Sequence, residues 1–399
     1  MSDAARRIAR MGFELSESEQ LTAATARDFA QRRLAPGAAE RDRTGRFPIE
    51  PFGELAGLGL HAMKVAESDG GAGVNNTAYL LAMQAIAEAC ASTAVVLASS
   101  NLSAKIFADY ATVEQKRRWL DPYLSGRLGP ASFALSEPGC GSDAAALTTR
   151  ARLEGDRWVL DGEKMWITGA TAAGLHLVFA RTDGPGRDGI SCFVVERGAP
   201  GLGVGKEEDK MGQRASGTAA LHLDGCRVEG ANLIGRRGGG YAVALSALGP
   251  GRVGIAGLSL GLGEAALALG TGYAQTRRAF GSALTDFQNT QFVLADARID
   301  LDAAWLLALR AARLLDAGDR AAAETSMAKL FASEAAGRVA DRMLQLHGGY
   351  GYHRDYAIER IYRDVRVTRI YEGTSEIQRI VVARELLRAS SGDGARGAR

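Results

Sequence analysis

The spacing of apolar residues divides the chain into a helical part, a β-rich part and a second helical part. In the first third, Ser16 and Glu19 form a capping box that opens a helix, which we expect to end before Pro36. The run from about residue 79 to 98 is rich in Ala, Leu and Val and predicts one long, largely buried helix. The N-terminal third is therefore expected to be α-helical.

The middle third, from about residue 129 to 235, consists of short runs of β-branched and aromatic residues broken by Gly, Asp and Pro. Asp161-Gly162 separates two of these runs and Asp224-Gly225 follows another, and such dipeptides are typical of hairpin turns. We therefore expect a small antiparallel sheet, with further strands at 177–180 and 190–195.

Helical periodicity returns from about residue 241. One helix is expected to end at Gly348 and Gly349, and another precedes it, so this third is predicted to be a helical bundle. The apolar faces of the two helices are formed by Leu301, Trp305, Leu309 and Leu315, and by Met327, Leu330, Phe331, Ala335, Val339, Met343 and Leu346.

These patterns predict an α+β fold with three domains. The N-terminal α-helical domain is placed at 13–125, the middle antiparallel β domain at 126–238 and the C-terminal helical bundle at 239–388. Residues 389–399 lack apolar content and are predicted to form a disordered tail.

The composition is that of an ordinary globular protein. Of the 399 residues, 46% are hydrophobic and 24% are charged, and the formal net charge is +2. A balance this close to neutral argues against a nucleic-acid partner. No segment approaches 18 consecutive strongly apolar residues without charge, which argues against insertion in a bilayer.

The four cysteines are scattered without C-x-x-C spacing, and the five histidines are equally dispersed. This pattern favours a reducing compartment over a disulfide scaffold and predicts no metal site. The first residues lack the apolar run of a secretory signal and are interpreted as the start of a cytoplasmic protein. The cysteines are Cys90, Cys140, Cys192 and Cys226.

Three glycine motifs are interpreted as structural. Residues 249–254 satisfy G-x-G-x-x-G, but they follow a predicted helix, contain a proline and lack the later acidic residue, so a Rossmann site is not expected. Residues 257–261 match G-x-S-x-G within a helical stretch, where small residues allow close helix packing. Residues 201–206 lack P-loop spacing and are expected to form a turn.

Two segments in the β-rich part could contact a cofactor. Residues 133–143 join an apolar strand to a loop with Gly139 and Gly141, which can bring backbone N–H groups against a polar ring or a phosphate. About 20 residues later, Trp166 and Thr168 are expected on one face of a strand, because side chains two apart point the same way. Taken alone, the first segment is equally compatible with an ordinary loop, and a tryptophan in a strand is more often part of the core.

With two further motifs, the chain resembles the acyl-CoA dehydrogenase family from about Leu15 to Leu387. The motifs, in order, are residues 133–143, residues 164–169, residues 345–352 with Asp355, Arg360 and Asp364, and residues 370–379. The resemblance is closest to the short-chain (butyryl-CoA) and branched short-chain members. It implies an N-terminal α-helical domain, a middle β domain, a C-terminal four-helix bundle and a homotetramer.

The resemblance also implies FAD, held where the three domains meet and bordered by a neighbouring subunit. Arg277 suits a phosphate, because a guanidinium can donate two parallel hydrogen bonds, although an exposed arginine is the simpler interpretation without the family. The implied cofactor residues are Phe133, Leu135, Ser136, Gly141, Ser142, Trp166, Ile167, Thr168, Arg277, Phe280, Gln288, Gln345, Gly348, Gly349, Thr374 and Glu376.

Glu372 matches the catalytic glutamate of the family's short-chain and medium-chain branches. The implied reaction removes the α-proton of an acyl-CoA with Glu372 and passes the β-hydride to N5 of the flavin, giving trans-2-enoyl-CoA, with electron-transfer flavoprotein as acceptor. Such a base needs a dry site that raises its pKa. The implied substrate contacts are Ser142, Arg252, Tyr371 and Gly373, with the N–H of Glu372 against the thioester carbonyl.

Two glycines bear on this assignment. Some relatives place the base on the helix that begins near Arg252, and the corresponding residue here is Gly251, so Glu372 has no visible competitor. Many relatives carry an aspartate three residues before this arginine, against the CoA portion, whereas this chain has Gly249. That departure leaves open an acyl chain attached to a carrier protein instead of CoA.

An acyl-CoA oxidase, a DNA-binding protein and a non-catalytic helical adaptor are less favoured functions for the same pattern. An oxidase usually carries a long additional C-terminal domain, and DNA-binding relatives carry a basic C-terminal extension, whereas only Arg396 and Arg399 follow Arg388 here. A non-catalytic adaptor would purify colourless. The chain length and branching of the acyl group are not given by the sequence.

Overall fold

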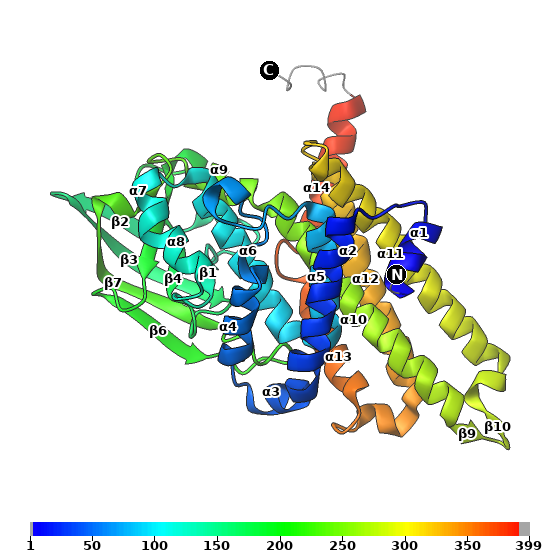
Figure 1. The fold of residues 1–399 in the computed structure, drawn as a ribbon. Helices are drawn as coiled ribbons and strands as arrows, with labels where there is room; N and C mark the ends of the chain where they lie inside the picture. The colour runs from blue at the N-terminus through cyan, green and yellow to red at the C-terminus, as the bar shows by residue number, and fades with distance from the viewer. Residues whose placement is uncertain (1–2, 391–399) are drawn as a thin grey trace.

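The computed structural model describes residues 3–390, and its N-terminal part is helical as the apolar pattern predicts (Figure 1). The capping box is confirmed: the Ser16 hydroxyl accepts from the Glu19 N–H at 3.3 Å, and the Glu19 carboxylate accepts from the Ser16 N–H at 2.8 Å. The helix ends at Phe29, before Pro36, and the chain continues through a π turn and a 3-10 turn. The helices are α1 (Asp3–Arg10), α2 (Glu17–Phe29), α3 (Ala38–Thr44), α4 (Ile49–Gly57), α5 (Asn76–Ala89), α6 (Ala91–Tyr110), α7 (Val113–Gln115) and α8 (Asp121–Leu124).

The single helix expected over residues 79–98 is wrong, because two helices occupy this run. Cys90 adopts extended backbone at φ −156°, which separates α5 from α6. The predicted burial is confirmed, since nearly all side chains of the run are buried. The break allows α6 to diverge toward the β domain, where Phe107 shares a core cluster with Leu177 and Phe179.

The middle of the chain forms an eight-stranded sheet in the order β6-β7-β3-β2-β4-β5-β8, with β1 beside β4. Most neighbours are antiparallel, as expected, but β1 and one residue pair of β2 run parallel to β4, so the sheet is mixed. Its strands are β1 (Ala131–Ala134), β2 (Arg150–Glu154), β3 (Arg157–Ile167), β4 (Leu175–Arg181), β5 (Ile190–Glu196), β6 (Leu202–Glu207), β7 (Ala219–Glu229) and β8 (Leu233–Ile234). The strands predicted at 177–180 and 190–195 are confirmed.

The two Asp-Gly pairs do not form hairpin turns. β3 continues through Asp161-Gly162 and β7 through Asp224-Gly225, and the two strands pair with a register shift between Leu160 and Gly162. The Gly225 N–H donates to the Asp161 carboxylate at 2.8 Å, so the pairs face each other across an irregularity of the ladder. The β2–β3 turn lies instead at Gly155-Asp156. Of residues 201–206, expected to be a turn, only Gly201 lies in a turn, and residues 202–206 belong to β6.

The last third returns to helices, as predicted. α10 packs against α5, α11 and α12, and α12 also packs against α14, so a bundle forms (Figure 1). The elements are α9 (Gly240–Ser246), α10 (Leu248–Thr276), β9 (Arg278–Ala279), β10 (Ser282–Ala283), α11 (Gln288–Asp316), α12 (Ala322–His347), α13 (Ala357–Arg366) and α14 (Ser375–Ser390). Of the predicted disordered tail 389–399, Ala389 and Ser390 end α14, and residues 391–399 lie outside the described part of the chain.

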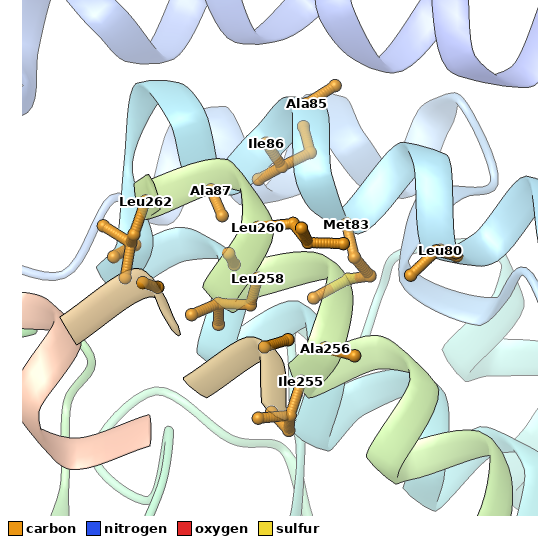
Figure 2. Packing of buried hydrophobic residues seen from close by; sticks show 14 of the residues in the cluster. Leu80, Met83, Ala85, Ile86, Ala87, Ile255, Ala256, Leu258, Leu260 and Leu262 are labelled. Carbon is orange, nitrogen blue, oxygen red and sulfur yellow. The ribbon is translucent and has the colours of Figure 1, made fainter. Parts of the chain in front are cut away.

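Close packing between α5 and α10 explains the glycine motif at residues 257–261. A Cβ on Gly257 or Gly261 would lie 2.6 Å from the Leu80 carbonyl oxygen or 2.3 Å from that of Gln84, so only glycine allows this approach. The side chains between the helices are apolar and interdigitate around Met83 (Figure 2). The motif at residues 249–254 also lies within α10, so neither forms a strand-to-helix turn.

The stretch Gly240–Thr276, which holds α9 and α10, is long and apolar enough to cross a bilayer by length and composition alone. However, 72% of its most apolar window is buried inside the protein. The same apolarity therefore serves the packing against α5, α11 and α12.

Candidate active site

Glu372 lies in the short loop between α13 and α14 and has an unusual backbone. Its φ is +53° and that of Gly373 is +88°, and the left-handed region is costly for a residue with a Cβ. Three hydrogen bonds hold the loop: the Gln378 side-chain amide donates to the carbonyls of Glu372 and Gly373, each at 3.0 Å, and the Lys329 ammonium donates to the Gly373 carbonyl at 2.7 Å. The loop is thus fixed from α12 and α14.

The Glu372 carboxylate lies against α10. A Cβ built on Gly251 would lie 3.1 Å from Glu372 Oε2 and 3.5 Å from Leu102 Cδ1. The two positions at which the family resemblance places a base are therefore neighbours in space, and glycine at one of them leaves room for the carboxylate from the other.

Burial raises the pKa of Glu372, and the nearby cations Lys329 and Arg252 oppose that rise. Arg252 is only 9% exposed, its Nη1 donates to the Ser326 hydroxyl at 3.1 Å, and its Nε has no hydrogen-bond partner among the described residues. Burial lowers the pKa of Arg252 and Glu372 opposes the shift. A carboxyl group whose pKa is raised above its ordinary value in this way suits a general base.

A cavity of about 410 Å³ brings most of the predicted site residues together. It is lined by residues of the β1 loop, of the end of β3, of α6, α9, α10 and α14, and of the Glu372 loop. The predicted residues on its wall are Phe133, Leu135, Ser136, Gly141, Ser142, Trp166, Ile167, Thr168, Arg252, Tyr371, Glu372 and Gly373. Residues from three parts of the sequence thus meet at one place.

Trp166 lies on this wall, but in a backbone conformation that the sequence pattern does not predict. Its φ is +63°, and the pairing of β3 with β7 is irregular between Lys164 and Ile167, so the simple alternation used to place Trp166 and Thr168 on one face breaks here. Both residues nevertheless line the cavity, and Trp166 is 59% exposed rather than buried in the core.

The loop after β1 is anchored by a buried ion pair. Lys164 Nζ donates to Glu137 at 2.7 Å and to the Leu135 carbonyl at 3.1 Å, and Glu137 accepts from the backbone N–H groups of Thr148 and Thr149. Burial tends to raise the pKa of Glu137, but Lys164 and these donors outweigh it and hold the pKa at about 2. The loop that lines the cavity therefore rests on a fixed, charged support.

Another group of predicted residues lines a second, more open cavity of about 720 Å³. Arg277, Gln345, Gly348 and Gly349 lie on its wall, and the Arg277 guanidinium lies 5.7 Å from the centre of the Tyr350 ring. The β9–β10 hairpin beside Arg277 is at the end of α10 remote from the sheet (Figure 1). One chain thus presents the two groups of predicted cofactor residues at separate places.

Four predicted cofactor residues line neither of these cavities. Phe280 is 99% exposed in the turn between β9 and β10, and Gln288 is the exposed first residue of α11. Thr374 and Glu376 lie at the start of α14, where the Thr374 hydroxyl accepts from the Ile377 N–H at 3.3 Å. Their assignment to the cofactor stays a prediction.

The residues that the sequence interpretation missed come mostly from helices. Lys329 is buried in α12 among apolar positions, and nothing in its sequence neighbourhood indicates that its amine reaches the Glu372 loop. Most of the others belong to helices in which the sequence shows no binding motif. The further lining residues include Val95, Ala98, Ser99, Arg187, Tyr241, Leu248, Ile255 and Arg384.

Comparison with known proteins agrees with this geometry along nearly the whole chain. The sequence matches the acyl-CoA dehydrogenase N-terminal domain at residues 16–127, the middle domain at 132–226 and the C-terminal domain at 238–387. It is 46% identical over 379 residues to a mitochondrial short-chain specific acyl-CoA dehydrogenase of Mus musculus, covering 94% of this chain and 92% of that protein.

Solved structures are similar as well. Butyryl-CoA dehydrogenase from Megasphaera elsdenii is 37% identical with a TM-score of 0.91, covering 94% of this chain and 100% of that chain. A chain from a structure of the electron-transferring flavoprotein of Acidaminococcus fermentans is 38% identical with a TM-score of 0.92, covering 94% and 99%. This chain therefore belongs to the acyl-CoA dehydrogenase family, FAD-dependent oxidoreductases that act on CH–CH bonds.

Proposed function

We propose that this protein oxidises a short-chain or branched short-chain acyl-CoA to its trans-2-enoyl-CoA, with Glu372 removing the α-proton. One observation carries the proposal: the Glu372 carboxylate, with its raised pKa, lies on the wall of the same cavity as Trp166, Thr168 and the β1 loop. A base and a binding surface for a planar ring are thus combined in one space of the size that holds a small ligand.

The residues of the cavity wall fit FAD. Trp166 offers an exposed flat apolar face, and the hydroxyls of Ser142 and Thr168 can hydrogen-bond to a polar ring or a phosphate. A Cβ on Gly139 or Gly141 would meet nothing within 4 Å, so the backbone of this loop is open to a ligand. When bound, FAD accepts the β-hydride at N5, a step that no amino-acid side chain can carry out.

Each residue of the Glu372 loop has a role in this proposal. The carboxylate takes the α-proton, and the Glu372 N–H donates to the thioester carbonyl, where negative charge develops as the proton leaves. Tyr371 and Gly373 border the acyl group, with Ser142 and Arg252 as further substrate contacts. Arg252 also keeps positive charge near the carboxylate.

The side chains packed beside Glu372 and α10 support a short acyl group. Leu102 and the Glu372 carboxylate both lie within 3.5 Å of the point that a Gly251 Cβ would occupy, so Leu102 fills space directly beside the base. Tyr79 packs on the same helix one turn further, where a Cβ on Gly254 would lie 2.5 Å from its hydroxyl. The Mus musculus relative, described as short-chain specific, agrees with this assignment.

We further propose electron-transfer flavoprotein as the electron acceptor, a homotetramer as the assembly and the cytoplasm as the location. The similarity to a chain from the structure of such a flavoprotein supports the acceptor. For the assembly, the open cavity at Arg277 and the fully exposed Phe280 would hold the adenosine side of a cofactor from a neighbouring copy, together with Gln288, Gln345, Gly348 and Gly349.

The test is anaerobic flavin reduction by Glu372→Gln. The variant is expected to retain FAD but to bleach it at least a hundredfold more slowly than the wild type with butyryl-CoA, because general-base catalysis is worth about 10² to 10⁴. Bleaching at the wild-type rate would refute the role of Glu372. A panel of straight, branched and aromatic acyl-CoAs, assayed in the same way, identifies the acyl group.

Gly249 supports a second candidate, the same chemistry on an acyl group attached to a carrier protein. A Cβ at Gly249 would meet only Leu315, at 3.9 Å, so this position offers no side chain to the CoA portion. Flavin reduction that is faster with the acyl-carrier form than with the matching acyl-CoA would favour this candidate. The reverse order would favour acyl-CoA.

A further inference from the structure

Lys329 is a charged side chain that the proposed reaction leaves without a role. It is fully buried in α12, and its Nζ donates to the Gly373 carbonyl at 2.7 Å. Removing an ammonium from water is costly unless a partner compensates for it. A buried lysine with one backbone acceptor therefore requires a further explanation.

The charges around Lys329 supply that explanation. Burial lowers its pKa to about 8, and Glu372 is the strongest group opposing that shift. The other charged groups that face it are Arg252 from α10, Glu334 on α12 itself and Glu376 from α14. In the reverse direction, Lys329 opposes the rise in the pKa of Glu372 more strongly than Arg252 does. The ammonium and the carboxylate thus stabilise each other's charged forms.

The same amine acts on the backbone of the loop. Glu372 keeps a left-handed φ of +53°, and its conformation depends on the bonds that Lys329 and Gln378 make to the loop carbonyls. Gln378 shares the Gly373 carbonyl with Lys329 but carries no charge. Two side chains therefore hold the loop, and of these only Lys329 carries a charge.

We propose that Lys329 is a positioning residue for the reaction, which fixes the Glu372 loop through the Gly373 carbonyl and supplies the positive charge that keeps the Glu372 carboxylate ionised. This inference rests on the proposed function, because it assigns Lys329 a role only through Glu372. Lys329 touches neither substrate nor flavin in this assignment: it is absent from the cavity wall.

The sign of the effect follows from the charges. Without Lys329, burial still raises the pKa of Glu372 but the larger opposing charge is gone, so the pKa rises further. At a given pH near its midpoint, a larger fraction of Glu372 is then protonated and cannot accept a proton. The acid limb of flavin reduction should move to higher pH, because a nearby opposite charge favours the ionised form of a carboxyl.

The test uses the FAD-loaded protein and two independent measurements, on Lys329→Met and Lys329→Gln. The first is the infrared band of the protonated Glu372 carboxyl, identified as the band missing from Glu372→Gln, titrated against pH. The second is the pH profile of anaerobic flavin reduction. Both midpoints are expected to move up together in both variants. The glutamine keeps a donor for Gly373 without the charge, so it separates the two contributions.

Two matched controls isolate the charge. Lys64 also has a pKa lowered to about 8 by burial and donates to a backbone carbonyl, that of Val74, but Glu372 is not among the groups that act on it. Lys64→Met should leave both midpoints unchanged. Gln378→Leu removes hydrogen bonds to Glu372 and Gly373 without changing charge, so it should lower the rate at every pH and leave the carboxyl midpoint where it is.

The outcomes distinguish this inference from the proposed function. If the carboxyl midpoint of Lys329→Met and Lys329→Gln equals that of the wild type, the inference fails, whatever the base is. If Glu372→Gln bleaches its flavin at the wild-type rate, the proposed function fails, and the infrared titration still reports whether Lys329 controls the ionisation of this carboxyl. A midpoint shift that Lys64→Met reproduces would also overturn the inference.

Discussion

Gly251 and Glu372 share one space: a Cβ on the glycine would lie 3.1 Å from Oε2 of the glutamate. This separation is tighter than an ordinary carbon–oxygen contact, so a side chain at 251 must displace the carboxylate. Under the proposed function, the absence of a side chain on this turn of α10 is therefore part of the catalytic geometry, as much as the glutamate itself.

Gly251→Ala tests this relationship. The added methyl should displace the carboxylate by a few tenths of an ångström and slow flavin reduction by about tenfold, since small misplacements of a catalytic group are costly. Gly272→Ala is the control on the same helix, because a Cβ there would meet nothing within 4 Å. Equal rates for the two variants in stopped-flow reduction, with equal FAD content, would contradict the argument.

Arg277 is expected to bind a phosphate of FAD, although one chain places it in a cavity separate from Glu372. Arg277→Gln should weaken FAD binding by about 10- to 100-fold, the range of a hydrogen bond to a charged group. Arg278→Gln, also exposed and next in sequence, should retain the wild-type affinity. The measurement is the fraction of FAD released as the protein is diluted. The oligomeric state is determined at the same concentrations. Unchanged affinity in Arg277→Gln would refute the phosphate role.

The sequence predicted what depends on local order along the chain, and it missed what depends on contacts between distant segments. The helix cap at Ser16 and the cavity residues near Trp166 and Glu372 each belong to a short motif, so they could be found. Asp161-Gly162 has the composition of a turn, but its pairing with β7 holds it within a strand. Lys329 is one residue in the helical pattern of α12, and its role requires the folded loop.

Asp364 makes stability depend on pH in a predictable direction. Burial raises its pKa to about 7, while the Gln213 N–H, which donates to it, lowers the pKa. Because the folded pKa lies above the ordinary value of about 3.9, the stability that the neutral group contributes is complete below about pH 4 and is lost as pH rises through 7.

Asp364→Asn should not lose this contribution. Its free energy of unfolding relative to the wild type should increase by about 2 to 4 kcal/mol between pH 5 and pH 8.5. Thermal melts at the two pH values measure the difference, and Asp156→Asn, an exposed position, should show no such trend. A constant offset between Asp364→Asn and the wild type would mean that the carboxyl stays ionised throughout.

Leu102 provides a test of the short-chain assignment, because its Cδ1 and the Glu372 carboxylate lie against the same point of α10. Leu102→Ala removes buried side-chain volume beside the base, so the space that opens can accept additional carbons of an acyl chain. The ratio of kcat/KM for hexanoyl-CoA to that for butyryl-CoA should rise by about 10-fold or more, in line with the value of one to two methylenes in an apolar pocket.

The control for Leu102→Ala must have the same cost in stability but no contact with the site. Leu97→Ala fits, because Leu97 is also buried in α6 and, unlike Leu102, is not among the nearest neighbours of the Gly251 Cβ position, and truncating a buried leucine costs about 2 to 5 kcal/mol wherever it occurs. If both variants lower the rates with the two substrates equally, Leu102 contributes only to packing. A change of preference in Leu102→Ala alone would show that this side chain limits the length of the acyl group, and that the short-chain character of the site is determined next to the base.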